Sequence, residues 1–364
     1  MPGQRLRRTR IADVAREAGV SKTAVSFAFN SPQRLSPDTV ARIRGVAEAL
    51  DYRPHPVARM LSQGRTMTIG VLTPQALSAS FSNPFFGLFS EGVAEAAEDS
   101  GYGVLFVSPL QGSLARAVAR ATVDGFVAIG LAEDHPEVEQ IRRAGLPIVL
   151  VDSAAFPEHG SVEVDDEGGA RKAAEHLVHL GHREFLVIGV EPPAFPGEED
   201  RPSGTATSVL QRRLEGYRRA LQAHRIRLAD DRLVVGPATF AGGRAAFHRA
   251  WEDGLRFTAV LAMSDAMAVG AMRAARELGL TVPSDLSVVG FDDLELAEHS
   301  DPPLTTVRQP VRRKGEEAVR LLLALADRRD GERPEHRTLP TRLIVRGSTG
   351  PAPRRRQEVI RTEE

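Results

Sequence analysis

Residues 11–30 read IADVAREAGVSKTAVSFAFN and decide the fold of the N-terminal part of the chain. Apolar residues recur first at the spacing of one helix face, at Ile11, Val14, Ala15 and Ala18. Gly19 ends this helix, and Ser21 can cap a second short helix over residues 22–29. The side chains of that helix that can face inward are Ala24, Val25, Ala28 and Phe29. Ala15 is small enough for the two helices to cross closely, and Gly19 permits the turn between them, so this stretch predicts a helix-turn-helix.

A third helix is expected to begin at Pro37, with Ser36 as its N-cap. Its predicted buried residues are Val40, Ile43, Ala47 and Leu50. Such a body leaves the outer face of residues 22–27 projecting, as a helix must if its side chains are to reach base edges in a DNA major groove. The side chains on this face are Lys22, Thr23, Ser26 and Phe27. A three-helix bundle without a DNA role is the alternative.

The charge of the chain is divided unevenly. Residues 1–66 contain 12 Lys and Arg against 5 Asp and Glu, whereas the rest of the chain contains 35 against 43. A basic module ahead of an acidic body indicates a partner that is a polyanion. A solvated arginine tail would show the same charge, so the helix-turn-helix pattern is needed to favour nucleic acid.

Residues 53–66, RPHPVARMLSQGRT, join this module to the rest of the chain. Pro54 and Pro56 end the preceding helix, and Pro56 can open a short helix that runs to about Gln63. Isolated helices shorter than about 12 residues are marginal in water, so we expect this one to form only against a partner or on DNA. Leu61 is then a candidate wedge between base steps of a minor groove. The alternative is a plain linker whose apolar residues pack on the next domain.

From Met67 onward, short β-branched runs alternate with helical stretches. The runs are TIGVL, GVLFV, GFVAI, PIVLV, EFLVIGV, RLVVG, TAVLAM and LSVVGF. Strands that are apolar on both faces belong to parallel sheets covered by helices. Eight such strands exceed one sheet of usual size, so we predict an α/β core of two lobes with a boundary near residues 160–169. We place an N-lobe at about 67–165 with a returning segment near 296–330, and a C-lobe at about 166–295 with the C-terminal strands.

Ligands of open α/β sheets bind beyond the carboxyl ends of the strands, so polar residues directly after a strand are candidate contacts. The candidates are Asp152, Ser264, Asp265 and Asp292, with Phe85 and Phe86 in the segment after the first strand. Carboxylates that accept paired hydroxyls, together with an aromatic face against C–H bonds, suit a sugar or nucleoside-like ligand. Two alternatives stay open: Asp265 caps the helix that follows it, and the phenylalanines belong to the core.

Nothing in the sequence indicates catalysis. The chain has no cysteine, which excludes disulfides, thiol nucleophiles and thiolate zinc sites. The motifs GxxxxGK, HExxH and GxSxG are absent, and GYGVLF lacks the third glycine of a dinucleotide fingerprint. His176 and His179 have the spacing of a metal pair, but no third ligand converges on them in sequence, so we expect neither a metal nor a cofactor. Because no apolar run is long enough for a membrane helix and no apolar segment follows the N-terminal arginines, we expect a cytoplasmic protein.

The first quoted stretch, followed by LSPDTVARIRGVAEALDYRPHPVARMLSQGRT, resembles the DNA-binding head and hinge of the lac repressor family of bacterial regulators. The resemblance implies a head over 1–53, a hinge over 54–66, and a dimer whose recognition helices read a pseudo-palindromic operator. It places Lys22, Thr23 and Phe27 at base-reading positions and Leu61 in the central minor groove. The other candidate DNA contacts are Ser26, Asn30 and Arg59. Phe27 departs from the family, where a polar or basic residue is common at this position. A phenyl ring can contact a thymine methyl but cannot hydrogen-bond guanine, so the base that this position reads differs.

Segments from DGFVAIG to PPLTTVRQP resemble, in order, the effector-binding core of the same family, a two-lobe fold like that of periplasmic binding proteins. The resemblance places Arg213 and Asp292 where family members hold the effector, and Phe240 and Asp152 near further contacts. Ser264 replaces an asparagine that is frequent there, so the effector need not be the sugar of a familiar member.

The function that this resemblance implies is a DNA-binding transcription regulator, a repressor, whose operator affinity is controlled by a small effector such as a sugar or sugar derivative. The alternative is a solute-binding receptor with the same two lobes and no regulatory role on DNA. The tail over 351–364 has no leucine heptads, so nothing in it favours a coiled-coil tetramer over a homodimer.

Overall fold

The computed structural model describes residues 9–53, 60, 64–131, 137, 140, 143, 145–153, 159–191, 208–326 and 334–353. The chain divides into two compact units, Met1–Met67 and Thr68–Glu364. This division lies one residue from the predicted border between hinge and core.

The first unit is a small helical body, with α1 (Ile11–Glu17), α2 (Lys22–Asn30), the 3-10 helix η1 (Pro32–Arg34) and α3 (Pro37–Ala49). Both predicted caps are confirmed, because Ser21 Oγ accepts the Ala24 N–H at 3.1 Å and Ser36 Oγ accepts the Thr39 N–H at 3.3 Å. Gly19 takes a φ of +63° in the turn, where a left-handed backbone favours glycine. The buried residues shared by the three helices are Val14, Ala15, Ala18, Val25, Ala28, Ile43 and Ala47.

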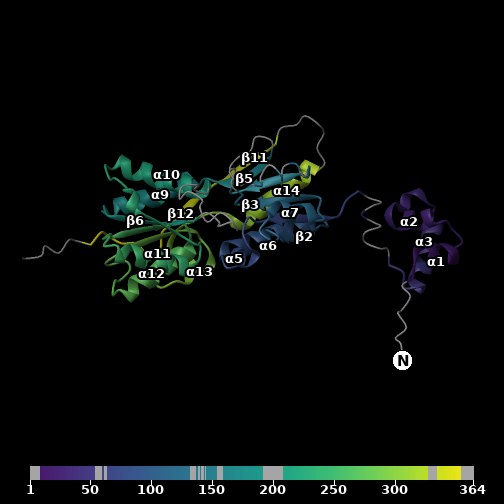
Figure 1. The fold of residues 1–364 in the computed structure, drawn as a ribbon, viewed down its shortest axis with the longest axis horizontal. Coiled ribbons are helices and arrows are strands. Elements are labelled where there is room, and N and C mark those ends of the chain that lie inside the picture. Colours follow the sequence, from purple (N-terminus) through teal and green to yellow (C-terminus); the bar gives the residue numbers. More distant parts are fainter. Residues whose placement is uncertain are drawn as a thin grey trace, which may run out of the picture. The chain divides into compact units, whose positions relative to one another are not determined.

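The N-lobe of the second unit contains a sheet of six parallel strands in the order β11-β5-β4-β3-β1-β2. The strands are β1 (Thr68–Leu72), β2 (Gly103–Val107), β3 (Gly125–Ile129), β4 (Ile148–Val151), β5 (Gly160–Val164) and β11 (His336–Leu339). The helices are α5 (Leu77–Phe81), α6 (Pro84–Asp99), α7 (Leu114–Arg120) and α14 (Val311–Ala326). Helices α6 and α14 share a core with one face of the sheet, and α7 shares a core with the other face (Figure 1).

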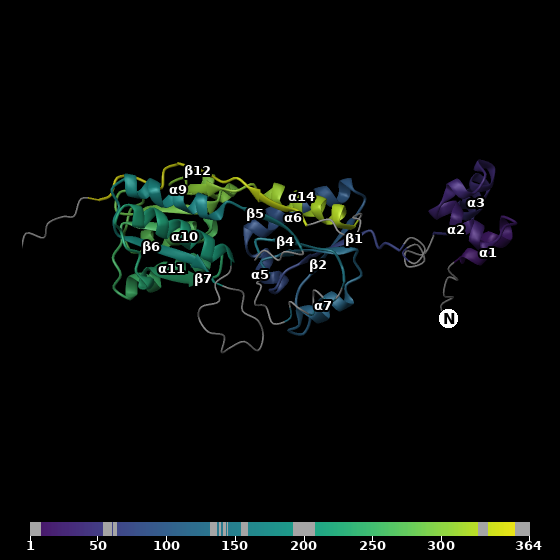
Figure 2. The same cartoon turned by 90° about the horizontal axis from the view of Figure 1, so that it is seen from above.

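The C-lobe repeats this plan with the strand order β12-β10-β9-β8-β6-β7. Its strands are β6 (Phe185–Val190), β7 (Leu233–Gly236), β8 (Ala259–Ala262), β9 (Ser287–Asp292), β10 (Thr305–Arg308) and β12 (Arg342–Ile344), the last antiparallel to β10. Its helices are α9 (Asp166–His179), α10 (Ser208–Ala223), η2 (Asp230–Arg232), α11 (Phe240–Glu252), α12 (Asp265–Glu277) and α13 (Glu295–His299). Helices α9 and α10 cover one face and α11 and α12 the other (Figure 2).

The chain passes between the lobes three times, from β5 into α9, from β10 into α14 and from β11 into β12. The first passage lies within the predicted boundary near 160–169, but a strand and a helix occupy this stretch instead of turns. The predicted returning segment near 296–330 is wrong at its start, because α13 and β10 remain in the C-lobe and the chain returns only after Arg308. β11 also belongs to the N-lobe, so the C-terminal strands are divided between the two sheets.

Helices α6 and α14 cross with their backbones in contact. A Cβ atom on Gly92 of α6 would collide with the carbonyl of Arg312, and one on Gly315 of α14 would collide with the carbonyl of Phe89. Arg312 also bridges the pair through ion contacts of 2.6 Å with Glu91 and Glu95. The two helices are therefore held together as one rigid piece of the N-lobe.

Replacing His182 with alanine is expected to lower the free energy of unfolding by about 2–4 kcal/mol, because Thr258, Ser287 and the Gly350 carbonyl each lose a hydrogen bond and the buried ring leaves a cavity. His182 is fully buried, with Nδ1 3.0 Å from Thr258 Oγ1 and Nε2 2.9 Å from Ser287 Oγ and 3.1 Å from the Gly350 oxygen. Urea unfolding followed by the fluorescence of Trp251, the one tryptophan of the chain, measures the loss in the C-lobe.

The pH dependence of unfolding gives a second readout for the same variant. Burial lowers the pKa of His182 from 6.5, so the unfolded chain binds the proton more tightly than the folded protein. The difference between the folded and unfolded pKa of His182 stabilises the folded protein above pH 6.5, and this stabilisation is lost as the pH falls through the folded-state pKa. The wild type should lose more stability between pH 7 and 5 than His182→Ala does, whereas exposed His299→Ala should match the wild type. Equal slopes for His182→Ala and the wild type would contradict this account.

Candidate functional site

Helix α2 presents the predicted DNA-reading face on the first unit. Lys22 and Thr23 are exposed, and Phe27 is half-buried on the same face. The guanidinium of Arg34, from η1, lies 5.1 Å from the centre of the Phe27 ring. Sequence reasoning did not single out Arg34, because its place beside Phe27 depends on how η1 folds back on α2.

Two other predicted DNA contacts pair with each other along α2. Asn30 Nδ2 donates to Ser26 Oγ at 3.3 Å, and both side chains are half-buried. Arg59 and Leu61 lie outside the described residues, so their predicted roles in the hinge stay predictions.

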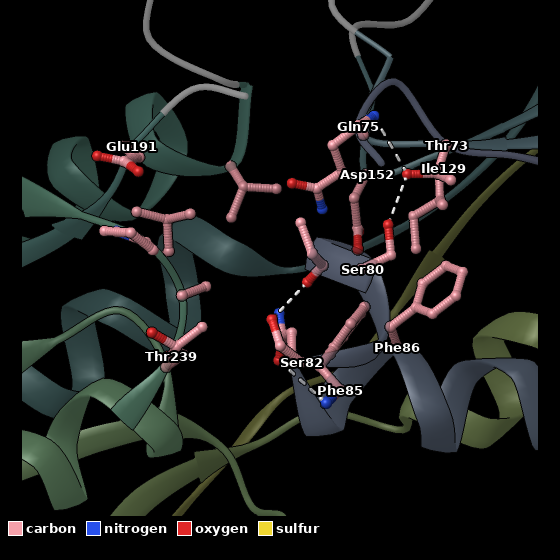
Figure 3. Close-up of a pocket in the computed structure, with 18 of the residues that line it drawn as sticks. Thr73, Gln75, Ser80, Ser82, Phe85, Phe86, Ile129, Asp152, Glu191 and Thr239 are labelled. Atoms are coloured by element: carbon pink, nitrogen blue, oxygen red, sulfur yellow. Dashed lines mark hydrogen bonds between the residues drawn. The ribbon is translucent and has the colours of Figure 1, made fainter. Parts of the chain in front are cut away.

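A cavity of about 490 Å³ opens between the two lobes of the second unit, in the size range of small-molecule sites. It lies at the carboxyl ends of parallel strands from both sheets, where ligands of α/β folds bind. Figure 3 shows Thr73, Asp152 and Phe85 on the N-lobe side, with Glu191 and Thr239 on the C-lobe side. The predicted effector contacts that line the cavity are Phe85, Phe86, Asp152, Arg213, Ser264 and Asp292.

The N-lobe wall combines aromatic rings with polar side chains. Phe85 and Phe86 begin α6, and Phe86 is also part of the N-lobe core. Thr73 Oγ1 and Ser80 Oγ lie 2.9 Å apart in the same wall (Figure 3). Asp152 directly follows β4 with a φ of +52°, a left-handed conformation that few side chains adopt. The wall thus offers an apolar face beside hydroxyl and carboxylate oxygens.

Arg213 of α10 anchors the C-lobe wall. Its Nε donates to Asp166 Oδ1 at 2.8 Å, its Nη1 donates to the Met263 carbonyl, and its guanidinium lies 3.5 Å from the centre of the Phe291 ring. Arg212 also donates to Asp166, at 2.9 Å. Burial alone would raise the pKa of Asp166, but the guanidiniums of Arg213 and Arg212 hold it below its ordinary value. Asp166 therefore stays ionised and fixes Arg213 against the cavity.

Asp292 is the last residue of β9 and is nearly completely buried. Burial raises its pKa to about 6, although Arg213, a hydrogen bond from Gln309 and Lys314 all favour the ionised form. Gln309 Nε2 donates to Asp292 Oδ1 at 2.5 Å. The backbone of Asp292 has a φ of +124°, which is strained for any residue except glycine. Strain and a displaced pKa at the edge of a cavity are typical of a binding or reaction site.

Two of the predicted effector contacts do not line the cavity. Asp265 is fully buried, and its carboxylate accepts the Leu294 N–H at 2.8 Å and the Thr306 hydroxyl at 2.5 Å. It therefore ties α12 to the turn after β9 and to β10, which corrects its predicted role. Phe240 begins α11 beside the lining residue Thr239 but is itself 46% exposed and outside the lining.

Ser264 lines the cavity, but its side chain has a structural task. Its Oγ accepts the Met267 N–H at 3.2 Å as the N-cap of α12. The helix cap that the sequence offered for Asp265 is thus supplied by its neighbour. The sequence did not predict Gln309, which lines the cavity after β10, or Lys314, which lies behind it.

Comparison with known proteins supplies the class of this site. The family model for bacterial regulatory proteins of the lacI family matches residues 10–55, and that for a periplasmic binding protein-like domain matches residues 174–349. The HTH-type transcriptional regulator CelR of Thermobifida fusca is 32% identical over 354 residues, which cover 95% of this chain and 99% of the relative. The regulator MalR of Streptomyces coelicolor is 35% identical over 361 residues, covering 95% and 98%. The chain belongs to the LacI family.

Solved LacI-family structures share the whole architecture. A CelR–cellobiose complex has a TM-score of 0.69 at 29% identity, covering 94% of this chain and 100% of its own. The lac repressor dimer bound to operator and the anti-inducer ONPF has a TM-score of 0.78 at 27% identity, with the same coverage. As a LacI-family member, the chain is a transcription regulator that binds DNA through its helix-turn-helix. The predicted family and the predicted fold class are both confirmed.

The described part of the LacI-family chain contains no group of three or more His, Asp or Glu side chains placed to hold a metal ion. His176, half of the candidate metal pair, instead has its Nε2 3.0 Å from Thr349 Oγ1. None of its helices has the length and apolar character needed to cross a membrane.

Proposed function

We propose that this LacI-family protein is a repressor that binds a pseudo-palindromic operator as a homodimer and changes its affinity when a sugar occupies the inter-lobe cavity. One observation carries the effector role: Asp152 of the N-lobe and Asp292 of the C-lobe line the same cavity, each placed at a strand end by a positive φ. A ligand biases the orientation of the two lobes only if it binds one orientation more tightly than the other. A ligand that contacts both carboxylates meets this condition, because its contacts change when the lobes shift. Its site of action is expected to be the cytoplasm, where the DNA is.

The chemistry of the cavity favours an uncharged sugar. Its acidic lining residues are Asp152, Asp292 and Glu191. The cations beside it are held by protein carboxylates, Arg213 by Asp166 and Lys314 by Asp152. Because these cations are already paired, a phosphate group would be repelled by the lining carboxylates and would find no unpaired cation beside them in the described part of the chain. Sugar hydroxyls, in contrast, can donate hydrogen bonds to the carboxylates. Two structural relatives were solved with a bound sugar, CelR with cellobiose and a LacI-family regulator from Enterococcus faecium with ribose.

The expected coupling runs from the lobes to residues 54–66. In the dimer that the family resemblance implies, the distance between the paired N-lobes sets whether two hinge helices can form and whether Leu61 can enter the minor groove. Allosteric coupling is typically about 1–3 kcal/mol, so the effector needs only to bias a hinge that is nearly balanced. The sign of the anisotropy change when a sugar is added to the protein–DNA complex shows whether the effector releases the DNA or promotes its binding.

Fluorescence anisotropy with labelled duplex DNA tests the DNA role. We expect binding to random duplex at low salt that weakens steeply as salt rises, with a log–log slope near −9 if the dimer contacts about ten phosphates. The duplex upstream of the protein's own gene should bind more tightly than random DNA. The receptor alternative predicts no binding to either duplex, so a flat titration at low salt would overturn the proposal.

The sugar role is tested with the same protein. Cellobiose, maltose, ribose and glucose are added in a thermal-shift assay and then to the protein–DNA complex. At least one neutral sugar should raise the melting temperature and change the anisotropy, and glucose 6-phosphate should do neither. Stabilisation by the phosphorylated sugar but not by glucose would contradict the uncharged effector.

A further inference from the structure

A lysine is fully buried directly behind the wall of the cavity. Lys314 is 0% exposed and lies in the first turn of α14, where the chain re-enters the N-lobe after its second passage. Burying an ammonium group is costly unless it is paired and hydrogen-bonded. The partners of Lys314 therefore show what the residue does.

This ammonium contacts three lining residues of the cavity. Lys314 Nζ lies 2.8 Å from both carboxylate oxygens of Asp152 and 2.7 Å from Gln309 Oε1. It also lies 5.2 Å from the centre of the Phe85 ring. An ammonium has three N–H donors, and three acceptor atoms surround this one at hydrogen-bond distance. Lys314 thus holds three lining residues without lining the cavity itself.

The contacts continue across the crossing to the other lobe. Gln309 accepts from Lys314 through Oε1, so its amide nitrogen faces Asp292 and donates to it at 2.5 Å. An amide turned by 180° would present oxygen to the carboxylate and nitrogen to the ammonium, two unfavourable pairs. Lys314 therefore sets the orientation of the Gln309 amide. A continuous row of hydrogen bonds joins Asp152 after β4 to Asp292 at the end of β9.

We propose that Lys314 is a positioning residue of the effector site, which holds Asp152 directly and Asp292 through Gln309 so that both carboxylates face one sugar. The proposal rests on the sugar effector proposed above. An apolar side chain of equal length would fill the same space in α14, but it would remove the hydrogen bonds that Lys314 donates to the Asp152 carboxylate and the Gln309 amide.

The electrostatic surroundings of Asp292 supply a readout that packing alone would not move. The charged and titratable groups that act on it are Arg213 and Tyr217 of α10, Asp265 of α12, Asp152 after β4 and Lys314 of α14. Of these, Lys314 and Arg213 favour ionised Asp292, and they oppose the effect of burial. Loss of the Lys314 charge should therefore raise the pKa of Asp292 above its present value of about 6.

The test compares Lys314→Met and Lys314→Gln with Arg313→Met in the full-length protein. Arg313 is the preceding residue of α14, and its side chain is 64% exposed, so its replacement removes the same charge at the surface. The glutamine variant keeps a hydrogen-bond donor and provides a folded sample should the methionine variant aggregate. The titration midpoint of Asp292 is followed by ¹³C NMR of labelled Asp carboxyls, assigned with Asp292→Asn, and cellobiose affinity is measured by calorimetry.

Both Lys314 variants should raise the Asp292 midpoint and weaken cellobiose binding about tenfold or more, as expected when a polar contact to the ligand is lost. Arg313→Met should leave the midpoint and the affinity unchanged. Lys314 variants that behave like Arg313→Met in both measurements would overturn the proposal. A wild-type protein that does not bind cellobiose would count against that sugar as effector, and the position of the Asp292 midpoint would then decide the role of Lys314.

Discussion

The Asp292→Asn variant is expected to bind the effector about 100-fold more weakly than the wild type while binding operator DNA equally well. Hydrogen bonds to an ionised group contribute about 1.5–3 kcal/mol, and a carboxylate that accepts two sugar hydroxyls loses charge and one acceptor when it becomes an amide. The helix-turn-helix lies in a separate compact unit, so its binding surface is not altered. Calorimetry with the sugar found above and anisotropy with operator DNA measure the two affinities.

The pH profile of effector binding identifies the same carboxylate. The pKa of Asp292 is about 6, so near pH 5 about one-tenth of the protein carries an ionised Asp292 and the affinity should be about tenfold lower than at pH 7. This difference should disappear in Asp292→Asn. Asp301→Asn, at a side chain that is 92% exposed, should keep both the affinity and the pH profile of the wild type. A full effector response in Asp292→Asn would place the effector elsewhere.

Arg213→Met is expected to lower the free energy of unfolding of the C-lobe by about 3–5 kcal/mol. Arg213 is 4% exposed, and its guanidinium lies between Asp166, Asp292 and the ring of Phe291. Its removal leaves Asp292 without a buried cation from α10 and leaves Asp166 with Arg212. Urea unfolding followed by Trp251 fluorescence measures the change, and the effector response should be lost in the same variant.

A matched control is available on the same helix. Arg218 has a side chain that is 45% exposed and pairs at 3.3 Å with Asp230, which is 98% exposed. Such a surface pair contributes about 0–1 kcal/mol, so Arg218→Met should change the unfolding midpoint little. Adding Asp292→Asn to Arg213→Met should restore part of the loss, because it removes the buried carboxylate that Arg213 stabilises. An Arg213→Met loss no larger than that of Arg218→Met would show that the buried ion pair does not stabilise the lobe.

The head was predictable because its signals are local. Helix periodicity, two serine caps and a glycine turn lie within 40 residues, and each has a direct counterpart in α1, α2 and α3. In the core, eight strands were found from their apolar runs. The structure buries both faces of the six inner ones and leaves the edge strands β2 and β7 partly exposed. β10 and β11 have no apolar run, because their sequences TTVR and HRTL are short and polar. In β10, the buried Thr305 hydroxyl is hydrogen-bonded to Thr349 instead of exposed to water.

The cavity was predictable only as far as strand ends reveal it. Asp152 and Asp292 follow strands and line the cavity, but Asp265 follows a strand equally well and is used inside the protein. Sequence position alone cannot separate these outcomes, because they depend on which direction the side chain leaves the backbone. Lys314 stands in RRKGEE, which reads as a solvated helix face. Only the close crossing of α6 and α14 and the return of the chain from β10 bring it to Asp152.

The backbone at the two cavity carboxylates limits how the cavity can evolve toward another ligand. Asp152 and Asp292 have φ values of +52° and +124°, where a branched or bulky replacement would distort the strand end itself. Asparagine and glycine are the substitutions that the left-handed backbone of Asp152 accepts most readily, and glycine alone would be unstrained at the φ of Asp292. Descendants that bind another ligand in the cavity would therefore be expected to keep these two positions nearly fixed and to accumulate their changes in the surrounding walls, at residues such as Phe85, Glu191 and Thr239.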